Sequence, residues 1–282
     1  MPLIQRSDPY PHWLFTASHG DALRLVPERG GLVTGWCCDG REQLYFDAER
    51  FADPALSVRG GIPVLFPICG GLPGSRLPQH GFARDAVWSL AALPDDTGVS
   101  LSLEDTAASR DLFPHPFRLE LQLRLEPQAL AITMRLRHRG AAGDPPLPFS
   151  FGLHPYLAVT DPAAVRLEGL PEQLLDQVTQ QSVARDQALM QLAAGVDLLA
   201  GPVQRVRLLD PLAATAISLE VSAPLDLAVV WTDPPRPMVC LEPWTAPRGA
   251  LASGERLLQV QPGEDAVLAC RYRVERLDAS SS

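Results

Sequence analysis

The sequence predicts an all-β protein, a large antiparallel β-sandwich with a few short helices. Residues 117–126 alternate apolar side chains with charged or polar ones, which is the pattern of a strand with one buried face. Residues 130–136 repeat this pattern after a short connection that contains proline, so the two runs indicate a β-hairpin. Proline accounts for 28 of the 282 residues and lies mostly between such runs, which leaves little room for helices.

The other expected strands are shorter and are separated by glycine, proline or aspartate. They cover residues 99–103, 216–221, 225–231 and 267–274, and a buried strand is expected in the apolar run 62–68. Residues 171–192 are the exception, because PEQLLDQV and VARDQALMQL have compositions that favour helical turns. No repeat and no long linker interrupts the chain, so we expect a single domain over residues 1–282, with a frayed tail at 278–282.

Composition and charge narrow the classes of protein to which this chain could belong. Apolar residues make up 46% and charged residues 20%, which is enough apolar surface for a folded core. The net charge of −9 argues against nucleic acid as a partner, because nucleic-acid binding needs a basic face. No run approaches the ~18 apolar residues that span a membrane. The five cysteines show no paired spacing, so we expect reduced thiols and a cytoplasmic location.

Four short segments at the ends of apolar runs combine reactive side chains with glycine or proline. They are residues 59–61, 79–84, 151–156 and 241–248. His154 follows the apolar run PFSFGL, so it is either an acid–base residue or a core histidine bonded to a backbone carbonyl. Glu242 interrupts the apolar run MVCLEPW, and a carboxylate in such a run must be paired, hydrogen-bonded or catalytic. The alternative for Glu242 is a structural ion pair with an arginine.

Motifs for several other kinds of chemistry are missing. The sequence has no G-x-S-x-G elbow and no H-E-x-x-H or H-x-H spacing, so neither a serine hydrolase nor a metal enzyme is indicated. The glycine-rich stretch at residues 69–75 lacks the lysine and the helix of a phosphate-binding P-loop. We therefore expect no cofactor and no metal, and nothing in the sequence indicates an obligate protein partner.

Several segments together resemble the aldose 1-epimerase (galactose mutarotase-like) family, in its hexose-6-phosphate mutarotase branch. The resemblance rests on RGGIPVLFP, LPQHGFAR followed by Trp88, FGLHPYLAV and LEPWTAPRGAL, in the family's order and over most of the chain. LPQHGFAR and EPWTAPR are its most specific parts. The resemblance implies a galactose mutarotase-like supersandwich and the cofactor-free interconversion of the α and β anomers of a hexose, commonly glucose 6-phosphate.

The resemblance also implies roles for individual residues. Glu242 matches the general base and His154 the general acid. Five further positions match contacts to a sugar or sugar phosphate: Arg59, Gln79, His80, Arg84 and Asp197. The two arginines suit a phosphate group, because a guanidinium binds it through two hydrogen bonds. A surface ion pair is the alternative for each arginine.

The implied reaction needs one acid and one base at the same sugar. Glu242 as carboxylate takes the proton of the C1 hydroxyl while protonated His154 gives one to the ring oxygen, and the opened ring closes again as the other anomer. We expect the mutual attraction of the two groups to favour these charged forms.

Two other functions remain open at this point. A binding protein for a sugar or sugar phosphate could keep the same fold without turnover. A glycoside-cleaving enzyme would normally need two carboxylates, and only Glu242 stands in a motif. The chain also departs from the family pattern at Ile68 and Cys69, where aromatic surface is usual, so the sequence does not indicate the preferred sugar.

Overall fold

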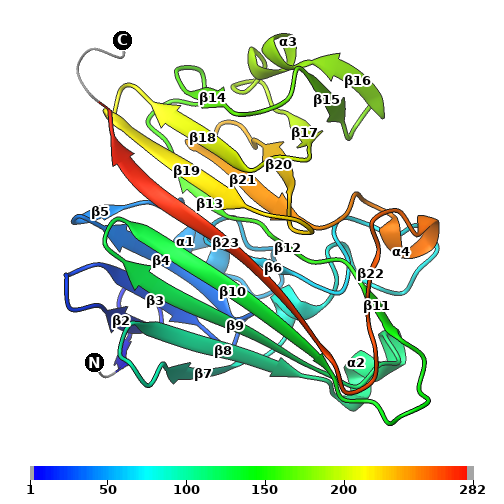
Figure 1. Cartoon of the computed structure of the whole chain (residues 1–282). Helices are drawn as coiled ribbons and strands as arrows, with labels where there is room; N and C mark the ends of the chain where they lie inside the picture. Colours follow the sequence, from blue (N-terminus) through cyan, green and yellow to red (C-terminus); the bar gives the residue numbers. More distant parts are fainter. Residues whose placement is uncertain (1–2, 278–282) are drawn as a thin grey trace.

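The computed structural model describes residues 3–277, and its regular secondary structure consists mainly of antiparallel sheets (Figure 1). Two large sheets pack against each other, and a five-stranded sheet, a two-stranded sheet and short helices complete the fold. The predicted all-β class with a few short helices is therefore confirmed. The expected fraying of residues 278–282 lies outside the described residues.

The first large sheet, called here the outer sheet, has eight strands. In spatial order they are β14 (Arg166–Glu168), β18 (Arg205–Asp210), β19 (Thr215–Val221), β23 (Asp265–Arg276), β10 (Ala129–His138), β9 (Phe117–Glu126), β8 (Gly98–Glu104) and β7 (Ser89–Ala92). Strands β9 and β10 form the predicted hairpin, with Leu125 opposite Leu130. Alternate residues of β9 are buried because only one face of this sheet covers the core.

The second large sheet, called here the site sheet, also has eight strands. They are β16 (Gln181–Ala184), β15 (Gln173–Asp176), β17 (Asp197–Ala200), β20 (Leu227–Trp231), β21 (Met238–Trp244), β12 (Gly152–Leu153) and β6 (Val64–Leu65), with β13 (Tyr156–Ala158) beside β21. Strand β21 is buried along its whole length. Val239 and Leu241 belong to the main core, whereas Cys240, Glu242 and Trp244 alternate to the other face. The site sheet can therefore enclose polar side chains on its second face.

Smaller elements complete the fold. One sheet contains β1 (Ile4–Arg6), β2 (His12–Thr16), β3 (Ala22–Val26), β4 (Leu32–Cys38) and β5 (Arg41–Glu42), and a separate pair contains β11 (Leu147–Phe149) and β22 (Leu258–Val260). The short helices are α1 (Ala48–Ala52), α2 (Ala107–Leu112), α3 (Arg185–Leu189), α4 (Ala250–Ser253) and the 3-10 turn η1 (Ala83–Asp85). Among residues 3–277, no helix has the length and apolar character needed to cross a membrane.

One apolar core joins the outer sheet to the site sheet. It contains Leu121 and Leu136 from the outer sheet together with Val239 and Leu241 from the site sheet. Tyr272 on β23 is buried in this core, and its hydroxyl donates a hydrogen bond to the backbone carbonyl of Leu241 at 2.8 Å. This bond anchors the backbone of β21 next to the position of the buried carboxylate.

Most of the predicted strands are present, and two predictions were wrong in part. The runs at 99–103, 216–221, 225–231 and 267–274 correspond to β8, β19, β20 and β23. Only β6 forms a strand within residues 62–68, because Pro63 and Pro67 have no amide hydrogen to donate to a neighbouring strand. Residues 173–176 form β15 rather than a helical turn, since pairing with β17 and burial of Leu174 outweigh local preference. Helix α3 confirms the helical turn expected in VARDQALMQL.

Replacing Tyr272 by phenylalanine would remove the hydroxyl that connects the two large sheets. The ring would still fill its place, but the Leu241 carbonyl would lose a buried partner. We expect Tyr272→Phe to lower the free energy of unfolding by about 1–2 kcal/mol, as measured by chemical denaturation. Val267→Ala, at an exposed position of the same strand, is the control. A Tyr272→Phe protein as stable as the wild type would contradict this prediction.

Candidate active site

A pocket of about 290 Å³ on the site sheet gathers the residues that the sequence singled out. Twelve residues line it: Ser57, Arg59, Gln79, His80, Arg84, His154, Tyr156, Asp197, Trp231, Glu242, Trp244 and Arg248. All seven predicted site residues are among them. The fold therefore brings these seven residues together from five separate stretches of the chain, and their individual roles stay predictions.

The register of the strands places His154 beside Glu242. The strand pairs on either side are Gly152 with Trp244 and Tyr156 with Cys240. This register sets His154 directly across from Glu242, with both side chains on the pocket face of the site sheet. The Nε2 atom of His154 lies 3.4 Å from the Oε1 atom of Glu242. The two groups are thus side by side.

Glu242 is a buried carboxylate whose side chain is only 1% exposed. Its Oε2 atom accepts a hydrogen bond from Nε1 of Trp244 at 3.1 Å. Burial raises the pKa of Glu242 well above its ordinary value, because the charged form loses its solvation, and the bond from Trp244 acts in the opposite direction. Within residues 3–277 the basic side chain in contact with its carboxylate is His154, and no arginine pairs with it, so the alternative of a structural pair with an arginine does not fit.

His154 is held in place by aromatic rings. It stacks on Tyr156 with 4.9 Å between ring centroids, and it meets the edge of Trp231 at 5.4 Å. Its Nδ1 atom is buried and has no hydrogen-bond partner in the described part of the chain, so a core histidine bonded to a backbone carbonyl does not fit. Burial lowers the pKa of His154 well below its ordinary value, and the charges of His80 and Arg84 act in the same direction.

Burial therefore acts against both charges of the pair. It disfavours the Glu242 carboxylate and the His154 imidazolium alike, whereas we expected mutual attraction to favour both charged forms. Between the lowered pKa of His154 and the raised pKa of Glu242, the pair holds one proton, which these shifts favour on Glu242; its transfer across the 3.4 Å contact to His154 gives the charged form of the pair. Two adjacent groups that share one proton can give a proton to one atom while taking one from another.

His80 occupies a tight turn next to this pair. Its φ is +66°, and in the following residue, Gly81, a Cβ would lie 2.0 Å from the carbonyl oxygen of Phe66. The Nδ1 atom of His80 accepts a hydrogen bond from the Gly70 amide at 3.0 Å, so a neutral ring carries its proton on Nε2. Burial, together with Arg84 and Arg248, lowers the pKa of His80 to about 3. His80 is therefore a neutral hydrogen-bond donor.

The two predicted arginines differ in how many of their donors are already used. Arg59 donates to Oδ2 of Asp233 at 3.1 Å and to Oγ of Ser57 at 3.1 Å. The buried Nε atom of Arg84 lies 3.8 Å from Oδ2 of the exposed Asp85, which is an ion pair, but it makes no hydrogen bond among residues 3–277. The ion-pair alternative therefore describes Arg59 better than Arg84, which keeps donors available in the pocket.

Arg248 lines the pocket, although the sequence did not single it out as a site residue. The sequence did contain a signal for Arg248, because this residue ends the EPWTAPR motif that begins with Glu242. It donates to Oδ2 of Asp197 at 2.6 Å, and Gln177 donates to Oδ1 of the same carboxylate at 2.8 Å. The aliphatic part of the Arg248 side chain packs against Gly70, where a Cβ would lie 2.3 Å from the Cγ of Arg248. Asp197 thus anchors Arg248, and its contact to a sugar stays a prediction.

The aromatic walls of the pocket were also missed. They are supplied by Tyr156, Trp231 and Trp244, and only the register of β13, β20 and β21 shows that these rings share one face. Ile68 and Cys69 are buried and do not line the pocket. The chain departs from the family pattern at these two positions, but aromatic side chains from other strands still line the pocket.

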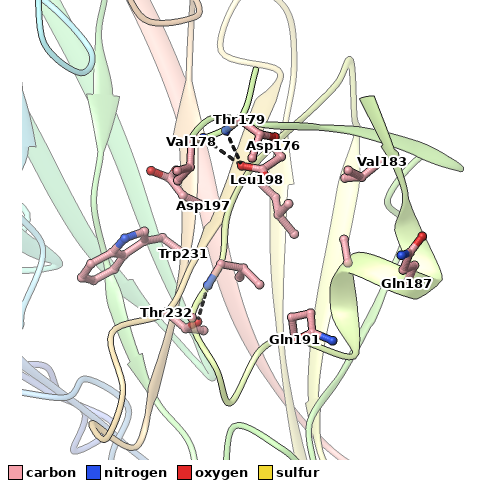
Figure 2. A pocket seen from close by; sticks show the side chains of 13 residues that line it. Asp176, Val178, Thr179, Val183, Gln187, Gln191, Asp197, Leu198, Trp231 and Thr232 are labelled. Carbon is pink, nitrogen blue, oxygen red and sulfur yellow. Dashed lines mark hydrogen bonds between the residues drawn. The ribbon is translucent and has the colours of Figure 1, made fainter. Parts of the chain in front are cut away.

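A larger pocket of about 570 Å³ adjoins the first one (Figure 2). The two pockets share Asp197 and Trp231, and the larger one extends from there toward β15, β16 and α3. The residues that line it include carboxylates, amides and valines, but among the described residues no histidine or arginine lines it. The larger pocket therefore lacks a histidine–carboxylate pair, and acid–base chemistry is predicted for the smaller one.

The family model described as "Aldose 1-epimerase" matches residues 14–273, a range that includes every predicted site residue. This chain belongs to the aldose 1-epimerase family. A curated relative from Cenchrus ciliaris, named "Putative glucose-6-phosphate 1-epimerase", is 34% identical over 151 residues, which make up 50% of this chain and 45% of the relative. The chain thus spans about half the length of that relative.

Solved structures of similar proteins agree with the observed fold. The Slr1438 protein from Synechocystis sp. PCC 6803 is 35% identical, with a TM-score of 0.89 over 98% of this chain and 100% of that protein. A galactose mutarotase-like protein from Lactobacillus casei is 17% identical, with a TM-score of 0.74 over 94% of this chain and 100% of that protein. The second likeness concerns the fold alone. Together with the strand order, these similarities confirm the galactose mutarotase-like sandwich of this aldose 1-epimerase family member.

The buried carboxylate has a consequence for stability that depends on pH. Since folding raises the pKa of Glu242, its contribution to stability is complete at low pH and is lost as pH rises from the ordinary value toward the raised one. We expect Glu242→Gln to unfold at a temperature several degrees above the wild type at pH 8, with a smaller difference at pH 5. Thermal unfolding would measure this, with the exposed Glu255→Gln as control. A lower unfolding temperature for Glu242→Gln at both pH values would contradict the prediction.

Proposed function

We propose that this protein is a cofactor-free mutarotase that interconverts the α and β anomers of a hexose 6-phosphate such as glucose 6-phosphate. The observation that carries this proposal is the 3.4 Å contact between Nε2 of His154 and Oε1 of Glu242 in a pocket that also contains arginines. Membership of the aldose 1-epimerase family supports a reaction at the anomeric carbon. All five cysteines are free thiols, which fits a protein that works in the reducing cytoplasm. We also propose that the chain works as a single domain.

The arrangement of the pair suits the two oxygens that must exchange protons. The C1 hydroxyl oxygen and the ring oxygen are bonded to the same carbon, so the base and the acid must both lie within hydrogen-bond reach of that one carbon's oxygens. Glu242 and His154 meet this requirement because they are cross-strand neighbours on one sheet face. A sugar laid on that face would contact both groups at once.

One shared proton is sufficient for the complete cycle. Glu242 takes the proton of the C1 hydroxyl as His154 gives one to the ring oxygen, the bond between C1 and the ring oxygen breaks, and an aldehyde forms. Rotation about the C1–C2 bond presents the other face of the aldehyde, and the reversed transfers close the ring. The pair gives one proton and takes one in each half of the cycle, so its proton count does not change.

The remaining side chains favour an anionic sugar. Arg84 has unused donors and is the main proposed contact for the phosphate, while Arg59 is partly occupied by Asp233. The Nε2 hydrogen of His80 and the amide of Gln79 are proposed to bond the sugar hydroxyls. Cations and neutral donors thus lie on the same pocket as the acid–base pair.

The competing functions fit these contacts less well. A glycoside-cleaving enzyme needs a second free carboxylate, and the other carboxylate of this pocket, Asp197, already accepts bonds from Arg248 and Gln177. A binding protein without turnover would have no need to enclose a carboxylate against an imidazole, which is costly unless the pair is used. The binding function is retained as the alternative that the first experiment tests.

Anomer exchange measured by NMR on glucose 6-phosphate would test the reaction. We expect the wild type to accelerate exchange, and His154→Ala and Glu242→Gln each to reduce the rate by about 10²–10⁴-fold, because each removes one positioned proton transfer. The double variant should lose little more than either single variant, since the two transfers act together. Glu255→Gln is the control. A wild type that binds the sugar phosphate without accelerating its exchange would establish the binding protein instead.

Comparison of phosphorylated and free sugar would test the role of Arg84. We expect Arg84→Ala to raise KM for glucose 6-phosphate by about 10-fold or more and to change exchange of free glucose much less. Arg59→Ala should have the smaller effect on this preference, because Arg59 already bonds to Asp233 and Ser57. An equal loss on both sugars in Arg84→Ala would argue against a phosphate contact.

A further inference from the structure

Cys240 does not line the pocket itself, but it completes a set of three metal-binding side chains with His154 and Glu242, which do. Its sulfur, a ring nitrogen of His154 and a carboxylate oxygen of Glu242 all lie within 4.8 Å of one another, and the three residues are largely enclosed. These three donor types are ordinary zinc ligands. The acid–base mechanism does not use the thiol of Cys240.

The site sheet presents these three ligands in a geometry that suits one ion. Cys240 and Glu242 are two positions apart on β21, so both project from the pocket face, and His154 projects from the neighbouring strand across from Glu242. Three ligands on one sheet face leave a fourth position pointing into the pocket. A water molecule or a sugar oxygen could occupy that position, as in zinc sites with three protein ligands.

Distances between the ligand atoms agree with this arrangement. Tetrahedral Zn²⁺ with bonds of ~2.0–2.2 Å to nitrogen and oxygen separates these two ligand atoms by ~3.4 Å. The observed distance from Nε2 of His154 to Oε1 of Glu242 is 3.4 Å. A thiolate ligand would lie ~3.6 Å from each of them, so the Cys240 sulfur, now within 4.8 Å of both, needs to approach by about 1.2 Å at most.

We propose that His154, Cys240 and Glu242 form a reversible Zn²⁺ site and that zinc bound there inhibits the enzyme. The thiol of Cys240, which now donates to the sulfur of Met238 at 3.8 Å, and the shared proton of the pair are both released to solvent when the ion binds. Zinc then occupies the nitrogen and the oxygen that would move protons. The inhibitory part of this inference rests on the proposed function, whereas zinc binding does not.

The site differs from a permanent structural zinc site. The Nδ1 atom of His154 has no partner among residues 3–277, whereas a metal-bound histidine usually donates this second N–H to a carboxylate, a carbonyl or water. The sulfur of Cys240 must also leave its contact with the sulfur of Met238 and move toward the other two ligands before it can bind the ion. We therefore expect an affinity in the micromolar range, suited to regulation by free zinc.

Metal binding can be measured without an activity assay. Equilibrium dialysis of the wild type against Zn²⁺ should give one bound ion per chain, and Co²⁺ should produce the near-ultraviolet absorption of a thiolate bound to cobalt. Cys240→Ser should remove this band and weaken Zn²⁺ binding by about 100-fold or more. Cys270→Ser, a buried cysteine on the outer sheet, is the matched control and should leave both unchanged. His154→Ala provides a second test should Cys240→Ser fail to fold, as judged by thermal unfolding.

The outcomes separate this inference from the proposed function. Absence of one-to-one binding, or a cobalt band that persists in Cys240→Ser, would overturn the zinc site. Zinc binding by a wild type that does not accelerate anomer exchange would leave the metal site in place and remove the proposed reaction. If exchange is accelerated and saturating Zn²⁺ does not slow it, the inhibitory role is wrong. We expect saturating Zn²⁺ to slow the wild type at least 10-fold and to slow Cys240→Ser much less at the same concentration.

Discussion

A carboxylate enclosed beside an imidazole is the interaction on which the rest of this structure depends. Burial raises the pKa of Glu242 and lowers the pKa of His154. The charged form of each group is therefore unfavourable in this environment. The pair is stable as a unit that holds one proton, and this is the state that a reaction with one proton in and one proton out requires. The same burial that makes the pair costly also makes it chemically suited to its proposed reaction.

The site sheet tolerates the free-energy cost of burying this pair because its central strand, β21, is covered on both faces. One face of β21 joins the main core through Val239 and Leu241, and Tyr272 bonds to the Leu241 carbonyl from the opposite sheet. The other face holds the carboxylate under aromatic rings. The large apolar interface between the two sheets therefore supplies the stability of the fold. It offsets the free-energy cost of burying the polar pair, which does not need to stabilise the fold itself.

The arginines around the pocket differ in whether an acidic neighbour already uses their donors. Each arginine is either bonded to an acidic residue or has donors left for a ligand, and the difference follows from its neighbours. Asp197 is close to Arg248 and is used there, whereas Asp85 lies at a longer distance from Arg84. Cys240 enters the same region only because alternate residues of β21 share a face, which places a soft metal ligand next to the acid–base pair.

The sequence by itself determined the all-β class and the β9–β10 hairpin, because alternation along a strand is a local signal. It also indicated seven of the twelve residues that line the pocket, through polar residues at the ends of apolar runs and through the family resemblance. It did not reveal β15, the position of Arg248 or the three aromatic walls, since each depends on which strand lies beside which. The protonation of His154 and Glu242 was also decided by tertiary structure alone. Burial and the 3.4 Å contact exist only after strands that are distant in the chain have paired, so no local pattern can encode them.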